Sequence, residues 1–125
     1  MRRVSIAAIV ILTVLFGVLY LLIESEKESN EFGNYEEMAE SGLINLGWIP
    51  AFIPKSAYDI KEEHRVDVSR IHVELKFDAS DINSFEVACN KLHEAAFICA
   101  NSGYPVKVLI TNGNYAIIRS VQNGT

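Results

Sequence analysis

The longest uncharged run of the chain, from Val4 to Ile23, constrains its structure more than any other feature. An α-helix rises 1.5 Å per residue, so a helix of this length spans about 30 Å, the thickness of the hydrocarbon core of a bilayer. The run is rich in β-branched Val and Ile, which are mediocre helix formers in water. In lipid an unpaired backbone group costs several kcal/mol, so a helix forms regardless of that preference. The run therefore predicts a transmembrane anchor over residues 4–23.

A cleaved signal peptide is the alternative interpretation of the same run. Its apolar core would be shorter, about 7–15 residues, and a small-residue cleavage site would follow. The sequence Leu21-Leu22-Ile23-Glu24 contains no such site, and no cysteine near the end of the run could carry a lipid. We therefore expect an uncleaved signal-anchor that crosses the membrane once.

The charges that flank the run predict its orientation. Arg2 and Arg3 precede it, whereas the segment 24–31 holds four glutamates and a single lysine. Positive flanks stay in the cytoplasm, so residues 24–125 should lie outside. For a short chain of this kind the expected setting is the bacterial inner (plasma) membrane, with a periplasmic domain. The net charge of −5 and the lack of a basic stripe argue against nucleic acid as a partner.

Three regions follow from composition and local pattern. Residues 24–34 (ESEKESNEFGN) are polar and acidic, which predicts a linker. Residues 35–125 are then the extracytoplasmic domain. Within it, residues 35–44 predict a short helix that ends at Gly42.

Two alternating segments, 58–65 and 70–77, predict a β-hairpin with residues 66–69 as its loop. In the register where paired residue numbers sum to 135, Tyr58 faces Phe77 on the inner side. The outer side then holds three complementary pairs, each of which stabilises the sheet by about 0.2–1 kcal/mol relative to alanine. A shift by one residue would place apolar side chains against charged ones. The predicted outer pairs are Asp59 with Lys76, Lys61 with Glu74, and Glu63 with His72. The same register places Ile60 opposite Leu75 on the inner face. It also puts Glu62 and His64 on the inner face, near an end of the sheet that we expect to be open to water.

The segment after this hairpin predicts a long helix. Asp78 to Asp81 offer N-cap residues, apolar side chains recur at helical spacing from Ile82 to Cys99, and Gly103 would end the helix. On one helix the Cα atoms of Cys89 and Cys99 would lie about 15 Å apart, beyond the roughly 7 Å that a disulfide can bridge. We therefore expect two buried thiols, with a disulfide possible only if the helix breaks between them. Phe97 and Ile98 do not fit the apolar stripe.

Residues 106–111 and 115–121 predict a second hairpin, because Asn112-Gly113-Asn114 is a strong turn signal. Together the segments predict an α+β domain of ββαββ order. Its antiparallel sheet would have four strands, with one helix packed on one face and a polar opposite face. The order of the strands is not determined by the sequence.

Few residues suggest chemistry. Glu62 and His64 lie on one strand face, where a carboxylate beside an imidazole could form a general base, but a structural hydrogen bond is the commoner outcome. Neither a metal-binding spacing of His and Cys, nor a nucleophile elbow, nor a phosphate-binding loop occurs in the sequence. We therefore predict no catalytic residue, no metal and no cofactor.

The segment Gly47–Pro54 (GWIPAFIP) has two interpretations. Its two prolines exclude a regular helix, and its aromatic side chains could form a surface for a protein partner. The candidate partner-binding residues are Trp48, Ile49, Phe52 and His64. Alternatively, the loop folds back and covers a core that is small for a domain of this size.

The run from Gly47 to Asp78 also resembles a pattern in a group of small uncharacterised bacterial membrane-anchored proteins and lipoproteins. A Trp-Ile-Pro loop there leads to Ser-Ala-x-x-Ile, a histidine and a strand that ends in Phe-Asp. The sequence NGNYAII is similar to the last hairpin of that group. The resemblance implies a fold and a membrane location but no activity. The matching residues are Trp48, Pro54, Ser56, Ala57, Ile60, His64, Asp67 and Phe77.

These observations predict a membrane-anchored extracytoplasmic domain with a non-catalytic binding or structural role and an envelope protein as partner. One alternative is an immunity or inhibitor protein against a toxin or lytic enzyme. The other is a hydrolase that uses Glu62 and His64.

Overall fold

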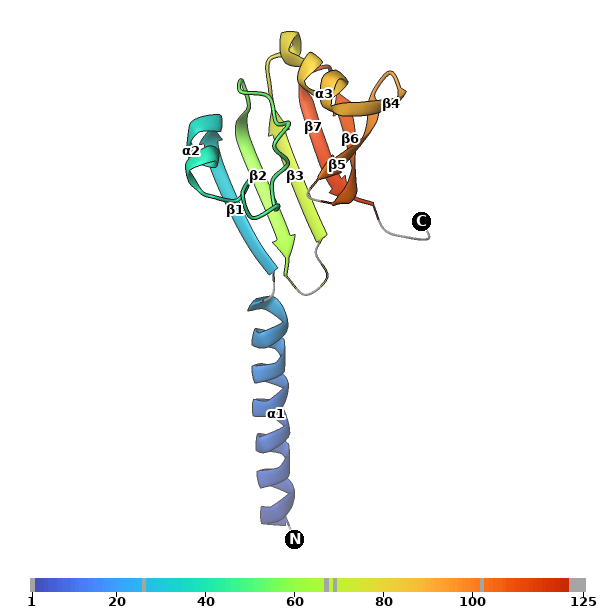
Figure 1. Ribbon diagram of the computed structural model, residues 1–125. Helices are drawn as coiled ribbons and strands as arrows, with labels where there is room; N and C mark the ends of the chain where they lie inside the picture. Colours follow the sequence, from blue (N-terminus) through green and yellow to red (C-terminus); the bar gives the residue numbers. More distant parts are fainter. Residues whose placement is uncertain (1, 26, 67, 69, 102, 122–125) are drawn as a thin grey trace.

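The computed structural model describes residues 2–25, 27–66, 68, 70–101 and 103–121, and it contains one long helix followed by one sheet domain (Figure 1). Helix α1 (Arg2–Ser25) projects away from the sheet. Its segment Ser5–Leu22 has a mean hydropathy of 2.7 and none of it is buried against the domain. The helix is therefore long and apolar enough to cross a membrane, as the uncharged run predicts.

Seven antiparallel strands form the sheet, in the order β1-β2-β3-β7-β6-β5-β4. The first three strands and the last four each form a meander, and the two meanders join where β3 pairs with β7. The antiparallel α+β class is as predicted, but the sheet has seven strands where ββαββ has four. The strands are β1 (Lys27–Asn34), β2 (Tyr58–Arg65), β3 (Arg70–Lys76), β4 (Cys89–His93), β5 (Ala96–Asn101), β6 (Tyr104–Thr111) and β7 (Tyr115–Ser120).

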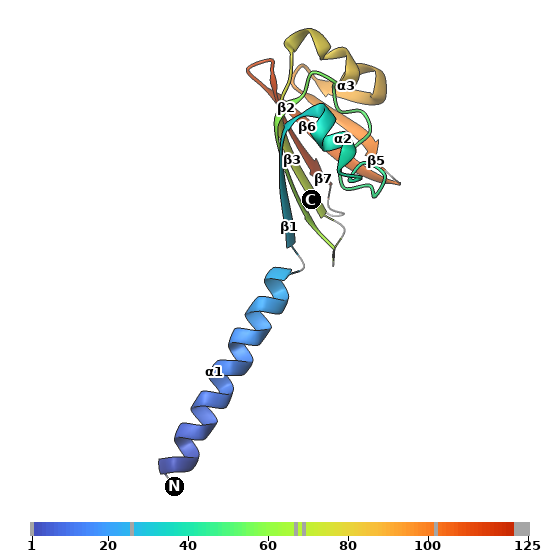
Figure 2. The same cartoon turned by 90° about the vertical axis from the view of Figure 1, so that its left-hand side faces the viewer.

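One face of the sheet is covered and the other is open. Figure 2 shows the covering elements on one side of the strands. They are α2 (Tyr35–Glu40), the long loop 41–57, the 3-10 helix η1 (Ala79–Asp81) and α3 (Asn83–Ala88). Because both α-helices have only six residues, much of the cover is irregular loop.

Phe85 of α3 lies at the centre of the core and is fully buried. Its ring meets Phe77 edge-on at 5.4 Å and Phe52 edge-on at 6.0 Å, and it stacks on Phe97 at 6.2 Å. Aromatic pairs at such distances stabilise a core beyond the area that they bury. This one side chain therefore joins the loop, the end of β3 and strand β5.

The segment predicted as an acidic linker is in fact largely strand β1. It pairs with β2 over its whole length, from Lys27 opposite Arg65 to Asn34 opposite Tyr58. Its composition predicts a linker because an edge strand has one free edge and exposes most of its side chains. Its inward side chains include Asn30, which donates a hydrogen bond to Glu62 of β2.

The predicted long helix is wrong beyond Ala88. The chain instead turns into β4 and β5, which pair so that Cys89 lies directly opposite Cys99. The two cysteines form a disulfide with a Cα–Cα distance of 4.4 Å, so the predicted pair of free thiols is also wrong. The helical spacing of apolar residues from Ile82 to Cys99 gave a wrong prediction. Leu92 belongs to that spacing but is exposed, whereas Phe97 does not fit it and is buried. Gly103, expected to end the helix, has φ +93° and lies just before β6.

The β2–β3 register is confirmed near the turn and shifts near the other end. Lys61 lies opposite Glu74 and Glu63 opposite His72, as predicted, but a register shift between Tyr58 and Lys61 places Tyr58 opposite Lys76. Asp59 within this shift has φ +48°. Tyr58 is consequently exposed instead of facing the core. Its predicted partner Phe77 lies beyond the end of β3 and is buried.

Three local predictions are confirmed. The last hairpin pairs Thr111 with Tyr115 around the Asn112–Asn114 turn, with positive φ at Asn112 and Gly113. A short helix, α2, forms and Gly42 follows its end with φ +81°. Asp78 accepts a hydrogen bond from the backbone N–H of Ser80 and so caps η1.

Reduction of the disulfide should destabilise the domain. A crosslink that closes a loop of this size stabilises a fold by about 2–3 kcal/mol, chiefly by restricting the unfolded chain. Urea unfolding of the full chain in detergent should show this loss when a reductant is added. The variant Cys89→Ala/Cys99→Ala should lose a similar amount and should no longer respond to the reductant. Equal stability of the oxidised and reduced chains would contradict the structural role of the bond.

Candidate functional site

The loop Gly47–Pro54 is bonded to the far half of the sheet at its first residue. Gly47 has φ +83°, and its carbonyl accepts hydrogen bonds from Asn101 Nδ2 at 3.0 Å and from the Tyr104 hydroxyl at 2.9 Å. Burial raises the pKa of Tyr104, and the hydrogen bond with Asn101 acts in the opposite direction. These two contacts hold the loop across the covered face.

The side chains of this loop point into the domain. Trp48 is half-buried and stacks on His64, with 4.2 Å between ring centroids and 12° between planes. Ile49 and Ile53 are buried, and Phe52 packs edge-on against Phe85. The loop therefore covers the core. A role of Trp48, Ile49, Phe52 and His64 in binding a partner stays a prediction, and only Trp48 and Phe52 are partly accessible to one.

Glu62 and His64 form the most buried polar cluster on the covered face. Each is only 2% exposed, and His64 Nδ1 lies 2.6 Å from Glu62 Oε1. Strand β1 supplies the other partners. Asn30 Nδ2 donates to Glu62 Oε2 at 2.9 Å, and Glu28 Oε2 lies 3.3 Å from His64 Nε2. Each β1 residue lies directly opposite its partner on β2, so strand pairing positions the whole cluster.

This cluster satisfies its own polar atoms and leaves little room for catalysis. Both ring nitrogens of His64 face carboxylate oxygens, and Trp48 covers the ring. A general base needs a nitrogen within reach of a substrate proton. Among the described residues, every buried side-chain nitrogen or oxygen has a hydrogen-bond partner. The expectation that the sheet is open to water at Glu62 and His64 is therefore wrong, and the pair acts as a buried structural network.

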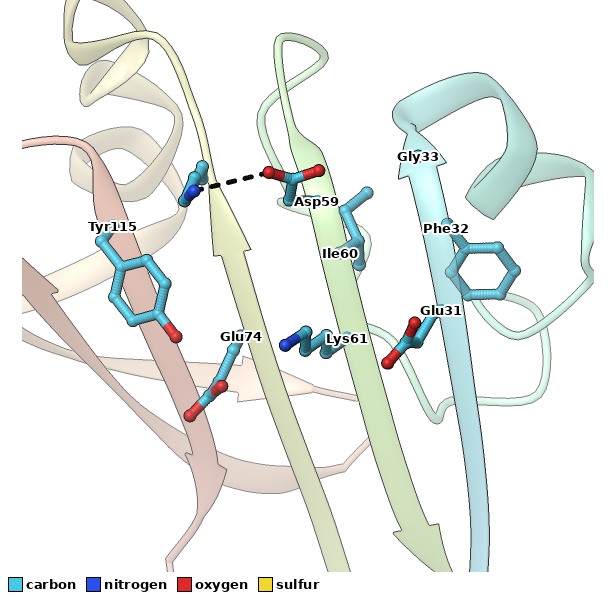
Figure 3. Close-up of a pocket in the computed structure, with 9 residues that line it drawn as sticks. Glu31, Phe32, Gly33, Asp59, Ile60, Lys61, Glu74 and Tyr115 are labelled. Carbon is cyan, nitrogen blue, oxygen red and sulfur yellow. Dashed lines mark hydrogen bonds and ion pairs between the residues drawn. The ribbon is translucent and has the colours of Figure 1, made fainter.

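The open face of the sheet carries a shallow, charged hollow of about 410 Å³ over β1, β2, β3 and β7. Figure 3 shows Lys61 between Glu31 and Glu74, which are its neighbours on the two flanking strands. At one end Lys76 Nζ lies 3.4 Å from Asp59 Oδ2. Small-molecule sites are mostly apolar and enclosed. This hollow is instead part of a surface on which opposite charges alternate.

A hydrogen-bonded row crosses the same open face. Arg119 Nε donates to His72 Nδ1 at 3.1 Å, and His72 Nε2 lies 3.1 Å from Glu74 Oε1. Because Nδ1 accepts, the proton is on Nε2 and is donated to Glu74. This bond is the main reason why the pKa of Glu74 lies below its ordinary value. Burial, followed by the bond to Glu74, raises the pKa of Tyr115. His72 lies opposite Glu63 as predicted, but its ring bonds to Glu74 and Arg119.

Sequence reasoning found His64 and Glu62 but missed the partners that complete their cluster. Those partners, Glu28 and Asn30, lie in the segment interpreted as a linker. Asn101, which holds the Gly47 carbonyl, was also missed, because it lies in the segment interpreted as the end of a helix. The signal that was available is the polar pair Glu62 and His64, on the same strand face as Ile60. Buried polar groups need partners, so a second strand with inward polar side chains had to lie beside β2.

A family described as the YbbD head domain matches residues 26–76, less than half of the chain. The matched segment begins directly after α1 and ends with β3, so it includes both strands of the buried polar cluster and the loop that covers it. No curated protein and no solved structure matches the chain. A sheet domain that follows a membrane-length helix fits a membrane-anchored protein.

Replacement of Trp48 by alanine should lower the free energy of unfolding by about 2–4 kcal/mol, because it removes a stacked ring from the edge of the core. Leu46→Ala is a matched control in the same loop, since Leu46 is exposed and should be nearly neutral. Chemical denaturation of the full chain measures both. A Trp48→Ala variant of unchanged stability that loses a partner would instead identify the loop as a binding surface.

The Glu62–His64 pair should be replaceable by apolar side chains together but not singly. His64→Leu alone leaves a buried carboxylate without its main partner and should cost about 3–5 kcal/mol. The double variant Glu62→Leu/His64→Leu should cost clearly less, because no buried charge remains. Denaturation of the two variants gives the comparison. A double variant that is well folded but loses a hydrolase activity that the unmodified protein has would instead favour the hydrolase alternative.

Proposed function

We propose that this protein crosses a bacterial inner membrane once, with its N-terminus in the cytoplasm, and that its extracytoplasmic domain has a non-catalytic binding or structural role. The observation that carries the proposal is a fully exposed apolar helix of membrane length, joined through one residue to a disulfide-bonded sheet. An exposed apolar helix needs lipid around it, whereas a disulfide persists in an oxidising compartment.

Two independent features support this orientation. Arg2 and Arg3 on the N-terminal side of α1 favour a cytoplasmic N-terminus. The Cys89–Cys99 bond is on the opposite side of the helix, and stable disulfides are rare in the cytoplasm. Both features favour the same side of the membrane for the domain.

The structure of the two sheet faces supports binding rather than catalysis. The covered face uses its only buried acid–imidazole pair among the described residues for internal hydrogen bonds. The open face presents alternating charges over four strands. Such a surface suits a polar protein partner, and an envelope protein is the partner class that we propose. A net charge of −5 disfavours nucleic acid.

The location can be tested with an alkaline phosphatase fusion placed after Thr125. We expect activity, because this reporter needs an extracytoplasmic environment, and we expect the fusion to stay with membranes after an alkaline carbonate wash. The domain should also migrate faster on a non-reducing gel than on a reducing one.

The matched control replaces Arg2 and Arg3 by glutamate, which removes the positive charge on the N-terminal side and should reduce the exported fraction. An inactive reporter that lies in the cytoplasm would show that the orientation is opposite to the one proposed. Mature protein that is free of membrane and trimmed near residue 24 would show a cleaved signal peptide instead of an anchor.

A further inference from the structure

A groove of about 610 Å³ lies between the loop 51–55 and the short helices η1 and α3, and it is larger than the hollow on the open face. Figure 1 shows α3 and α1 at opposite ends of the sheet. Tyr35, which lines the groove, follows β1 directly, so the whole length of that strand, about 25 Å, separates the groove from α1. In a domain that α1 anchors, the groove therefore faces away from the bilayer.

The two walls of the groove are fixed to each other. Ser56, just after the loop 51–55, accepts a hydrogen bond on Oγ from the backbone N–H of Asp78, just before η1, at 3.0 Å. Phe52, which lines the groove, packs edge-on against Phe85 of α3. A proline on each side of residues 51–53 restricts the backbone of the loop. The groove is therefore formed before a partner arrives, which lowers the entropy cost of binding.

The most exposed large apolar side chain among the described residues, Val87, lies on the wall that α3 forms. Single exposed apolar residues are ordinary on protein surfaces. In this six-residue helix, however, Phe85 makes the core contact, and a β-branched residue is a mediocre helix former. Neither packing nor helix formation therefore accounts for the valine. Together with Phe52, Ala51 and Ala88 it gives the groove an apolar lining.

Two groups of opposite charge line the same groove. Lys55 is exposed on the loop, and Asp81 is half-buried in η1. Within the described part of the chain, neither the ammonium of Lys55 nor the carboxylate of Asp81 has an ion pair or a hydrogen bond. The groove is thus complementary to a segment that carries an apolar side chain with an acidic and a basic residue beside it.

We propose that this groove binds an extended segment of an envelope protein. An apolar side chain of that segment lies against Phe52 and Val87, while an acidic side chain binds Lys55 and a basic one binds Asp81. The inference rests on the proposed function and deepens it, because it names the surface that holds the partner. The charged open face suits polar contacts, whereas the groove supplies the apolar anchor on which specific protein interfaces depend.

The first test uses a phage-displayed library of random twelve-residue peptides as the probe. The full chain is reconstituted in nanodiscs, and empty nanodiscs remove the peptides that bind lipid. We expect the selected peptides to share an apolar residue with an acidic and a basic residue close to it. Fluorescence anisotropy of one labelled synthetic peptide then gives its affinity for each variant of the chain.

Val87→Asp and Lys55→Glu should each weaken the peptide about tenfold or more, because each removes an anchoring contact. Leu46→Asp is the matched control, since Leu46 is 69% exposed in the same covering loop but does not line the groove. It should bind the peptide as the unmodified chain does. A peptide whose acidic residue is replaced by lysine should prefer Lys55→Glu to the unmodified chain, a reversal that misfolding cannot produce.

The partner in the cell is tested by photocrosslinking from a benzophenone side chain at position 87, with position 46 as the control. We expect a protein adduct from position 87 alone. The crosslinked segment, mapped by mass spectrometry, should contain an apolar residue with an acidic and a basic residue beside it. An adduct with lipid or with a second copy of this chain would overturn the inference.

Selected peptides whose affinity no groove variant changes would overturn the groove and leave the binding role to another surface. Failure to select any peptide would overturn the inference as well. Failure of the proposed location looks different, because an inactive cytoplasmic reporter in the fusion experiment would leave the peptide affinities unchanged.

Discussion

The domain has to close one face of a seven-stranded sheet with very little regular structure. Two six-residue helices and a loop of irregular backbone must exclude water from the inward side chains of the strands. Phe85 makes this possible, because its ring contacts residues from three segments that are far apart in the sequence. A domain of roughly a hundred residues buries a limited fraction of its surface, so a single well-placed aromatic side chain carries a large share of the packing.

The buried polar cluster also helps to hold the covering loop on this face of the sheet. Glu62 and His64 follow Ile60 on the inner face of β2, and each has a hydrogen-bond or ion-pair partner on β1 directly opposite. These contacts stabilise the pairing of residues 27–34 with β2 as the edge strand, although the segment is polar and has a weak strand propensity. Trp48 then stacks on the ring of His64, so the loop, β2 and β1 form one connected unit. Polar satisfaction and apolar packing thus depend on each other at this edge of the sheet.

Local patterns predicted the elements that depend on local chemistry. The uncharged run, the alternation around Ile71–Leu75 and the Asn-Gly-Asn turn each indicate their structure with few residues, and the structure agrees with all three. The errors concern segments whose state depends on distant partners. Strand β1 forms by pairing with β2. Strands β4 and β5 form a hairpin whose ends away from the turn are joined by the Cys89–Cys99 disulfide, and β5 also pairs with β6. A helical stripe and a buried strand are hard to separate over so few residues, and Phe97 was the residue that favoured the strand.

The candidate site shows the same limit. His64 and Trp48 are conspicuous as residues, yet their stacking arises from a loop that crosses the covered face and is bonded through Gly47 to β5 and β6. No local pattern contains that contact. The open face was easier to anticipate, because alternation alone places Lys61, Glu63 and their partners on it.

The direct junction of α1 with β1 also determines how the protein would respond to mechanical load. If a partner pulls the head away from the membrane, the tension enters at Lys27 and runs along the axis of β1. Hydrogen bonds of an antiparallel ladder lie perpendicular to the strands, so the bonds between β1 and β2 are loaded together in shear instead of being opened one after another. A junction at the opposite end of β1 would let the edge strand peel. The observed attachment would therefore resist separation of β1 from β2 under such a load.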